Sequence, residues 1–491
     1  MTEQFAYDTV PYDTEANPEA HPRSMATLAR LFGRVAAPPS TARVLEIGCG
    51  DGEHLIAAAS YLRRARFVGF DLSAEAIARG VAVARAAGVE NVELLHRDVR
   101  DVRAEGLGAF DYVIAHGVYS WVPEAIRADV LAVMRAALAP GGIGFVSVNA
   151  LPGWSLRRAL RALMREASAD LDDPAAKVRA ALALVDEVAA AGATESGFFG
   201  VLANAAEEYR AHVTAATPPD APFSRYVFHD LLAECNDPFS VEELVARLRA
   251  AGLRLICETP LARSRATDFD GLADEMARSG SPFLQVLVER DDANAASTAS
   301  DAVRTDAIRE MQLWADLAPA PGGAFRTTTG ALLKAAAGSP LDRAARSAPG
   351  FVGVSALVGD REGEKDGSGD ALARLEHDLF VSSCEGVLSL ATEAAPIVGV
   401  TDRPRVDAYV RARARGALDR GARTAVVTSA LHRSYRVTAA ELEVIALLDG
   451  QRTTAEIVTE LGGRAAHVET VIERFARYGF LIGGAGEGET R

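Results

Sequence analysis

A glycine-rich turn directly after an apolar run is the chemically most specific feature of this 491-residue chain. Residues 44–52 read VLEIGCGDG, which predicts a strand that enters a Gly-x-Gly-x-Gly turn at the start of a helix. Glycines allow a sharp turn and let a ligand approach a helix N-terminus closely. A dinucleotide-binding fingerprint would need a glycine at position 53, where the chain has Glu53, and no Gly-Lys-Ser/Thr follows. The spacing therefore argues against both dinucleotide binding and a phosphate-binding P-loop.

Acidic residues stand at the ends of three predicted strands. Glu46, beside the turn, would repel a phosphate but suits a ligand with an amino group and a positive sulfonium, as in S-adenosylmethionine. Asp71 could accept hydrogen bonds from both ribose hydroxyls, and Asp98 could contact the adenine amino group. Each acid alone is more often a strand-end cap. Because ligands bind at the carboxyl edge of an open parallel sheet, the three acids together predict S-adenosylmethionine as the cofactor.

The elements that must position these residues alternate between residues 43 and 148. Short β-branched runs and Ala-rich stretches follow one another there, which is typical of βα units that build a parallel sheet. We predict strands at 43–47, 66–70, 91–95, 111–115 and 143–148. Ser73 is expected to cap the helix that runs through Arg85, Pro123 to occupy a first helical position, and the Pro-Gly-Gly at 140–142 to end that helix. The pattern predicts a doubly wound α/β sheet.

The remainder of the chain predicts further units. Residues 155–210 read as helical, with an arginine-studded first helix that we interpret as a solvated face. Residues 240–258 and 282–289 predict a capped helix and two strands that pair as an antiparallel edge of the first sheet. A linker is expected at 290–305 and a mobile loop at 359–370. Two similar units, each with three helices and a closing Gly-hydrophobic-Leu, predict a winged-helix repeat, and the second unit has capping-box spacings at Thr438 and Thr453.

Composition and charge narrow the class of protein. The 52 basic and 67 acidic residues leave a net charge of −15, which repels nucleic acid as a whole. Residues 401–436 are the exception, with nine Arg against three Asp, and are the place where an acidic partner could dock. No apolar stretch is long enough for a spanning helix, and the N-terminal residues lack a signal-peptide pattern. The four cysteines have no metal-like spacing, so we expect no metal site and a reducing, cytoplasmic location.

Motifs outside the turn extend the pattern over nearly the whole chain. They are YDTVPY at 7–12, HGVYSWVP at 116–123, LPGW at 151–154, RYVFH at 225–229 and LLDG at 447–450. With these motifs the sequence resembles the class I S-adenosylmethionine-dependent methyltransferases. More narrowly, it is similar to the bacterial subgroup with a methyltransferase regulatory domain, which includes protein lysine methyltransferases acting on outer-membrane proteins.

Two segments depart from the pattern of that subgroup. Residues 17–20 read NPEA where the family has an aromatic residue followed by Pro-Gln-Thr, and Val148-Asn149 stands in place of Tyr-Asn. Position 19 thus carries an acid where an amide is expected. If these positions touch the cofactor or the substrate, the acceptor differs from that of the lysine enzymes.

The resemblance implies a Rossmann-like doubly wound sheet with a helical regulatory insert and C-terminal winged-helix-like α/β units. We expect a cofactor-binding core at 1–165, a regulatory region at 166–295, a first winged-helix-like unit at 306–398, and an Arg-rich connector with a second such unit at 399–491. An N-terminal segment is expected to fold over the cofactor as a lid. The implied cofactor-binding residues are Tyr7, Tyr12, Glu46, Gly48, Cys49, Gly50, Gly52, Asp71, Leu72, Asp98, Val99 and His116.

Methyl transfer from a sulfonium is a direct displacement that requires alignment of donor and acceptor and exclusion of water. In this fold the loop after the fourth strand faces the methyl group, which makes His116, Tyr119 and Trp121 the catalytic candidates. An aromatic face of Tyr119 or Trp121 could contact the sulfonium or an alkylammonium product. His116 could accept the acceptor's proton, because an ordinary histidine pKa of about 6.5 leaves it mostly neutral at pH 7. Ordinary packing is the alternative for each of the three.

The sequence thus predicts an S-adenosylmethionine-dependent methyltransferase that N-methylates lysine side chains of a protein substrate. The large extra units favour this acceptor, because a protein needs a docking surface where a small molecule needs only a pocket. One alternative is a small-molecule methyltransferase whose extra units serve dimerisation, so a homodimer is left open. The other is a non-catalytic protein that senses S-adenosylmethionine and holds an acidic partner with residues 401–436.

Overall fold

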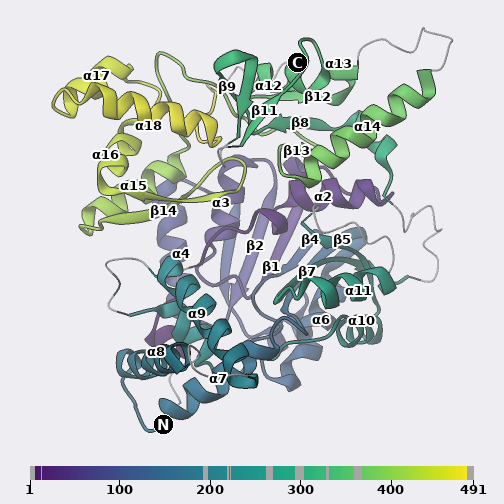
Figure 1. Ribbon diagram of the computed structural model, residues 1–491, viewed down its shortest axis with the longest axis vertical. Helices are drawn as coiled ribbons and strands as arrows, with labels where there is room; N and C mark the ends of the chain where they lie inside the picture. The colour runs from purple at the N-terminus through teal and green to yellow at the C-terminus, as the bar shows by residue number, and fades with distance from the viewer. Residues whose placement is uncertain are drawn as a thin grey trace.

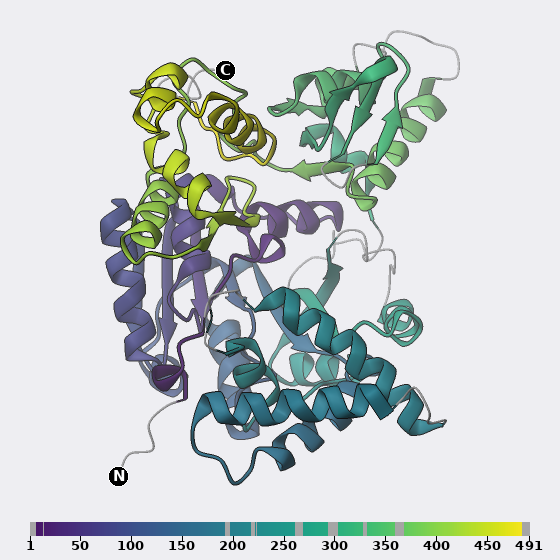
Figure 2. The ribbon, with the colours of Figure 1, turned by 60° about the vertical axis from the view of Figure 1, so that its left-hand side comes forward.

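The computed structural model describes residues 6–12, 14–191, 197–217, 221, 223–260, 269–292, 303–327, 331–358 and 368–483. Most of the predicted linker at 290–305 and of the predicted loop at 359–370 lies outside these residues. In Figures 1 and 2 the central sheet lies between a helical region at the lower end and the C-terminal elements, coloured green to yellow, at the upper end. Within the described residues no helix is long and apolar enough to cross a membrane.

A seven-stranded sheet forms the centre of the molecule, in the order β3-β2-β1-β4-β5-β7-β6. Neighbouring strands from β3 to β5 are parallel, and β7 is antiparallel to both β5 and β6. This is the class I methyltransferase fold, and the antiparallel edge is the one that the sequence predicted. The strands are β1 Arg43–Ile47, β2 Arg66–Asp71, β3 Val92–His96, β4 Phe110–Ala115, β5 Leu138–Asn149, β6 Leu253–Thr259 and β7 Phe283–Arg290.

Helices cover both faces of this sheet, so the residues of its central strands are apolar on both faces. Val44 of β1 belongs to the core on one face, and its neighbour Leu45 to the core on the other. Helices α2 Pro22–Leu31, α3 Glu53–Tyr61 and α4 Ala74–Ala87 contribute to the first core. To the second belong α5 Val99–Glu105, α6 Glu124–Ala137, α10 Val241–Ala250 and α11 Phe269–Ser279.

Most predicted element boundaries are confirmed, with two differences around α6. The Ser73 hydroxyl oxygen caps α4 by accepting the Ala76 backbone N–H at 3.0 Å. Pro123, however, is the N-cap of α6 rather than its first helical residue. The strand predicted at 143–148 is β5, which begins already at Leu138 because that residue pairs with Phe110 across a β-bulge. The Pro-Gly-Gly at 140–142 therefore lies within an extended segment.

A helical insert lies at the carboxyl edge of the parallel strands. It consists of α7 Ser155–Ala167, α8 Pro174–Ala191, α9 Phe198–Ala216 and the π-helix η3 Val227–Leu231. Its own core contains Trp154, Leu160 and Met164. The short N-terminal helix α1 Ala6–Thr9 lies beside this insert at the lower end of Figure 2. The insert thus places η3 near the ends of the strands that carry the candidate site residues.

The C-terminal part contains small sheets and two successions of helices. The first succession is α12 Pro340–Ser347, α13 Val354–Val358 and α14 Ser368–Cys384, and it accompanies the antiparallel sheet of β8 Gln312–Ala315, β12 Phe351–Gly353 and β13 Leu388–Ala391. A second small sheet joins β9 Ala318–Ala320, β10 Ala324–Arg326 and β11 Leu332–Lys334. Then follow α15 Ala408–Asp419, the hairpin β14 Thr424–Thr428 and β15 Ser434–Thr438, and α16 Ala439–Leu447, α17 Thr454–Glu460 and α18 Ala465–Arg477. Both predicted capping boxes are confirmed, and the winged-helix assignment stays a prediction.

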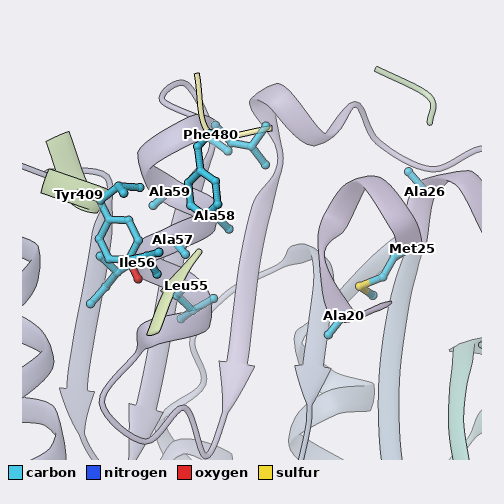
Figure 3. Close-up of a cluster of buried hydrophobic side chains, with 14 of the residues drawn as sticks. Ala20, Met25, Ala26, Leu55, Ile56, Ala57, Ala58, Ala59, Tyr409 and Phe480 are labelled. Carbon is cyan, nitrogen blue, oxygen red and sulfur yellow. The ribbon is translucent and has the colours of Figure 1, made fainter. Parts of the chain in front are cut away.

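Part of the Arg-rich segment packs against the rest of the chain, while several of its arginines, among them Arg415, Arg420 and Arg423, are exposed, so its role as a docking surface for an acidic partner stays a prediction. Helix α15 of this segment packs on α3, α4 and α16, and Figure 3 shows Tyr409 of α15 beside Ile56 of α3. The Tyr409 hydroxyl donates a hydrogen bond to the Glu53 carboxylate, and Arg413 lies 3.6 Å from the same carboxylate. These internal contacts join the C-terminal part to the helix that follows the glycine turn.

Candidate active site

The glycine turn is closely packed by two segments that are distant in the sequence. Gly48, Gly50 and Gly52 have φ angles of +68°, +57° and +74°. A Cβ atom at Gly48 would lie 2.4 Å from a Val118 methyl, and one at Gly50 would lie 2.7 Å from the Thr14 methyl. Only glycine fits these positions without strain. The loop after β4 and the N-terminal segment thus both contact the turn.

Three carboxylates surround this turn without a cation. Glu46 is 4% exposed, and its Oε2 atom is buried with no hydrogen-bond partner. Burial raises the pKa of Glu46 well above its usual value, and the nearby Asp71 and Asp51 raise it further. Within the described structure none of the three carboxylates forms an ion pair. A ligand with positive charge would relieve both the repulsion and the unpaired oxygen.

Asp71 already binds backbone groups of the turn. Its Oδ2 accepts the Gly50 N–H at 2.9 Å and its Oδ1 accepts the Ser73 N–H at 2.8 Å. Burial nevertheless raises the pKa of Asp71. Since each carboxylate oxygen has a further lone pair, Asp71 can still accept hydrogen bonds from ribose hydroxyls. Leu72 beside it is 47% exposed, as suits a residue that contacts a planar base.

Asp98 caps the start of α5, which is the alternative role that the sequence left open for it. Its Oδ1 accepts the Arg100 N–H at 2.8 Å at the start of α5, and its Oδ2 pairs with the Arg100 guanidinium at 2.6 Å. The hydrogen bond from the Arg100 side chain lowers the pKa of Asp98. Asp98 and Val99 are half-buried at the same edge as Leu72.

His116 follows β4 and is held from two sides. Its Nδ1 lies 3.0 Å from the Ser147 hydroxyl, and the Asn17 amide nitrogen lies 3.2 Å from Nδ1 and 3.3 Å from Nε2. Burial lowers the pKa of His116 to about 4. The imidazole is therefore neutral at pH 7 but a poor proton acceptor, which weakens the general-base role predicted for it.

The other two catalytic candidates lie in different surroundings. Tyr119 is 1% exposed, and its ring packs on Phe239 with 5.3 Å between the centroids. This placement supports packing, the alternative for Tyr119, over contact with a ligand. Trp121 is half-buried and donates a hydrogen bond to Asp230 in the helical insert. Cys49 is buried in the turn, and burial raises the pKa of its thiol well above the usual value.

The N-terminal segment crosses the carboxyl edge of the sheet. The Ser73 hydroxyl donates to the Asp8 carboxylate at 2.5 Å, and the Thr14 hydroxyl donates to Asp51. On the insert side, His229 Nε2 lies 2.6 Å from the Val10 carbonyl oxygen. Tyr12 is 37% exposed and contacts the His229 ring edge-on. Tyr7 lies in α1, and its side chain is outside the description.

Sequence reasoning missed the insert side of this site. Asp230 is buried, and burial raises its pKa to about 6, although the Tyr226 hydroxyl and the Trp121 indole lower it as hydrogen-bond donors. The Asp230 carbonyl accepts the Asn236 amide at 2.5 Å, and Asn149 at the end of β5 donates to Asn236 at 2.6 Å. The RYVFH motif at 225–229 drew attention to this region, but the sequence did not predict that the region lies beside the candidate site. The π-helix that bears Asp230 is a form often found at functional sites.

The two departures from the subgroup have structural partners. Glu19 accepts a hydrogen bond from the Thr259 hydroxyl at 2.7 Å, on the edge strand β6. Val148 is buried within the sheet. The acid at position 19 thus binds an edge strand of the sheet.

Comparisons with known proteins agree with this geometry. Residues 44–142 match the family model of a methyltransferase domain. Two uncharacterized proteins of Rickettsia prowazekii (strain Madrid E) are 39% and 37% identical over 158 and 163 residues, which are 32% and 33% of this chain. The chain covers only 28% and 65% of those relatives. The structure of PKMT2 from Rickettsia typhi in complex with AdoHcy superposes with a TM-score of 0.81 and 21% identity, over 96% of this chain and 100% of that one.

Proposed function

We propose that this chain, which carries a methyltransferase domain of the class I fold at residues 44–142, transfers a methyl group from S-adenosylmethionine. The observation that carries the proposal is the set of carboxylates at the glycine turn, with a buried Glu46 oxygen that has no partner. The cofactor has the two positive groups, a sulfonium and an ammonium, that such a set lacks. A phosphate-bearing cofactor would add repulsion to the same carboxylates.

Different residues at the sheet edge would bind different parts of the cofactor. The turn 48–52 and Glu46 would hold the methionine part, and Asp71 the ribose hydroxyls. Leu72, Asp98 and Val99 would contact the adenine. The segment with Tyr7, Tyr12 and Thr14 would cover the cofactor as a lid, which agrees with the contacts of Asp8 and Thr14 across the edge.

The cofactor, when bound, supplies a methyl group on a positive sulfur. The chain must then align the acceptor and exclude water, because a direct displacement needs no covalent nucleophile. Neutral His116, fixed by Ser147 and Asn17, can orient the acceptor by a hydrogen bond. Trp121 and Asp230 line the adjoining side.

We further propose a protein lysine side chain as the acceptor. The chain is similar over nearly its whole length to a structure whose name identifies it as PKMT2, and the sequence resembles a subgroup with protein lysine methyltransferases. The half-buried Trp121 and Tyr226 offer aromatic faces beside the Asp230 carboxylate, and an alkylammonium is attracted to both kinds of group. A small metabolite as acceptor is the competing assignment.

Transfer of a labelled methyl group tests both levels of the proposal. Purified protein is incubated with methyl-labelled S-adenosylmethionine and a lysate of the source organism, and the label is separated by gel and by small-molecule chromatography. Label in one or a few protein bands, found on lysine by mass spectrometry, is the expected result. Label only in small molecules would overturn the protein acceptor. Cofactor binding without any transfer would favour a sensor. Asp71→Ala serves as the inactive variant and exposed Asp170→Ala as its matched control.

A further inference from the structure

Three buried histidines from distant segments meet between the methyltransferase core and the C-terminal part. His21 precedes α2, His54 belongs to the first turn of α3, and His432 lies in the turn between β14 and β15. The ring centroid of His432 is 4.6 Å from that of His21 and 4.5 Å from that of His54. All three side chains are buried. The contact therefore joins the C-terminal part to the helix that begins at the glycine turn.

Hydrogen bonds continue from this contact to the candidate active site. His432 Nε2 lies 2.9 Å from His54 Nδ1, and the Asn17 backbone N–H donates to the same His54 Nδ1 at 3.3 Å. Because Nδ1 accepts from Asn17, we assign His432 Nε2 as a donor. The Asn17 side-chain amide donates to Gln285 Oε1 at 2.7 Å and contacts the His116 ring, 3.2 Å from Nδ1 and 3.3 Å from Nε2. Four residues thus form a path from the C-terminal part to His116.

The imidazoles of this path are neutral near pH 7. Burial lowers the pKa of His54 to about 3 and that of His116 to about 4. Burial also lowers the pKa values of His21 and His432, and the buried Arg23 guanidinium lowers them further. Neutral rings keep fixed donors and acceptors, so the path is a hydrogen-bonded frame and not a pH switch.

The turn that carries His432 is clamped in an unusual conformation. His432 has a φ of +59°, and no other described residue except glycine has a positive φ. Such a conformation persists only where surrounding contacts impose it. Here Arg23 donates to the Ala430 carbonyl at 3.2 Å, and the Ala430 N–H donates to the Gly479 carbonyl at 3.0 Å. The position of His432 therefore depends on both α2 and the end of α18.

We propose that the C-terminal unit, residues 399–483, positions the cofactor and acceptor site through this turn, with His432 as the positioning residue. His432 holds His54, and His54 holds the backbone of Asn17. The Asn17 side chain in turn contacts His116, and Asn17 belongs to the N-terminal segment whose Thr14 packs on Gly50. The inference rests on the proposed function, because it assigns regulation to the same site. A partner that displaces residues 429–433 would then change cofactor affinity without touching the sheet edge.

A double-mutant cycle on AdoHcy affinity tests this coupling. His432→Gly removes the ring and suits a positive φ, and Asn17→Ala cuts the other end of the path. Each single variant is expected to weaken AdoHcy binding by roughly tenfold in calorimetric titration. The Kd of the double variant for AdoHcy should be no higher than the higher of the two single-variant Kd values, because both changes break one path.

The matched control is Tyr409→Phe, which removes another contact between the same unit and α3 outside the path. It should lower thermal stability, leave the AdoHcy Kd within twofold of wild type, and combine additively with Asn17→Ala. A wild-type Kd in His432→Gly, or additive effects of His432→Gly and Asn17→Ala, would overturn the inference while the proposed function stands. Failure of the wild-type protein to bind AdoHcy would overturn both.

Discussion

The proposed cofactor half and the proposed acceptor half of the candidate site are built in different ways. The N-terminal lid aside, the cofactor half uses residues from 46 to 99, each at or just after the end of a parallel strand. The acceptor half combines the N-terminal segment, the loop after β4, Asn149 and the π-helix η3, which are separated by more than 200 positions in places. The first half is thus a set of local motifs on a common sheet edge, whereas the second exists only once the helical insert has packed.

The two halves also differ in charge. Glu46, Asp51 and Asp71 crowd the cofactor half without an ion pair among the described residues. In the acceptor half the single Asp230 carboxylate has two hydrogen-bond donors, and Arg157 and Arg161 of α7 lower its pKa further. The difference indicates that the cofactor half depends on charge brought by its ligand, while the acceptor half is closer to electrostatic balance on its own.

Loss of Asp71 is the largest effect that we expect, and it tests the charge dependence of the cofactor half. Asp71→Ala should weaken AdoHcy binding by at least about 100-fold, because charge-assisted hydrogen bonds contribute about 1.5–3 kcal/mol each and about 1.4 kcal/mol corresponds to tenfold in Kd. Isothermal titration measures the Kd, and circular dichroism checks that the fold is retained. Asp170→Ala should bind as wild type. Tight binding by Asp71→Ala would remove the cofactor assignment.

The close packing of the cofactor half is tested at Gly80 of α4. A Cβ atom there would lie 2.0 Å from the Asp51 carbonyl oxygen, which belongs to the glycine turn. Alanine is otherwise favoured over glycine in a helix by about 1 kcal/mol. We nevertheless expect Gly80→Ala to lower the free energy of unfolding by about 2 kcal/mol, as overpacking does, and to weaken AdoHcy binding.

Gly416 provides the control for this substitution. It lies within α15, where a Cβ atom would meet only the flexible end of Arg420 at 3.4 Å. Gly416→Ala should therefore be neutral or stabilising in urea unfolding. Equal effects of the two substitutions would show that the turn does not require a close helix.

The acceptor half is tested through the pH dependence of stability. Asp230 has a pKa of about 6 in the folded chain, and an unfolded aspartate has about 3.9. Since the folded state holds the proton more tightly, this carboxyl lowers the free energy of unfolding as pH rises through this interval. Asp230→Asn removes this carboxyl. Its free energy of unfolding, measured by urea unfolding, should therefore rise by about 1.5 kcal/mol relative to that of wild type as the pH is raised from 5 to 8.

Glu234→Gln is the matched control for Asp230→Asn, because Glu234 is exposed on the same segment. It should follow the wild-type pH profile. A stability difference between Asp230→Asn and wild type that does not change with pH would contradict the raised pKa of Asp230.

The smallest expected effect concerns His116, at the border of the two halves. With a pKa of about 4, His116 does not titrate between pH 5.5 and pH 8. The pH profile of AdoHcy affinity should therefore have no step near 6.5 that depends on this residue. A step near 6.5 in wild type that disappears in His116→Asn would show that the site is more open to water than its burial indicates.

The sequence predicted the local structure around the glycine turn closely, since that structure depends on neighbouring residues. A strand, a glycine turn and a helix cap are specified by neighbouring residues, and Ser73 caps α4 as expected. Tyr119 and Trp121, by contrast, stand in one motif two positions apart, and only packing decides that Tyr119 faces Phe239 while Trp121 faces Asp230. The arginines of 401–436 likewise suggested a surface, and the fold directs Arg413 to Glu53.

By itself, the sequence determined the order of strands and helices, the glycine turn and the acids that lie at one sheet edge, because these follow from spacing and from the direction of parallel strands. Only the tertiary structure decided which side chains complete the acceptor half and that the C-terminal unit reaches the site. Those contacts join segments such as 17, 54, 116 and 432, and the packing that brings them together depends on the whole core rather than on any local pattern.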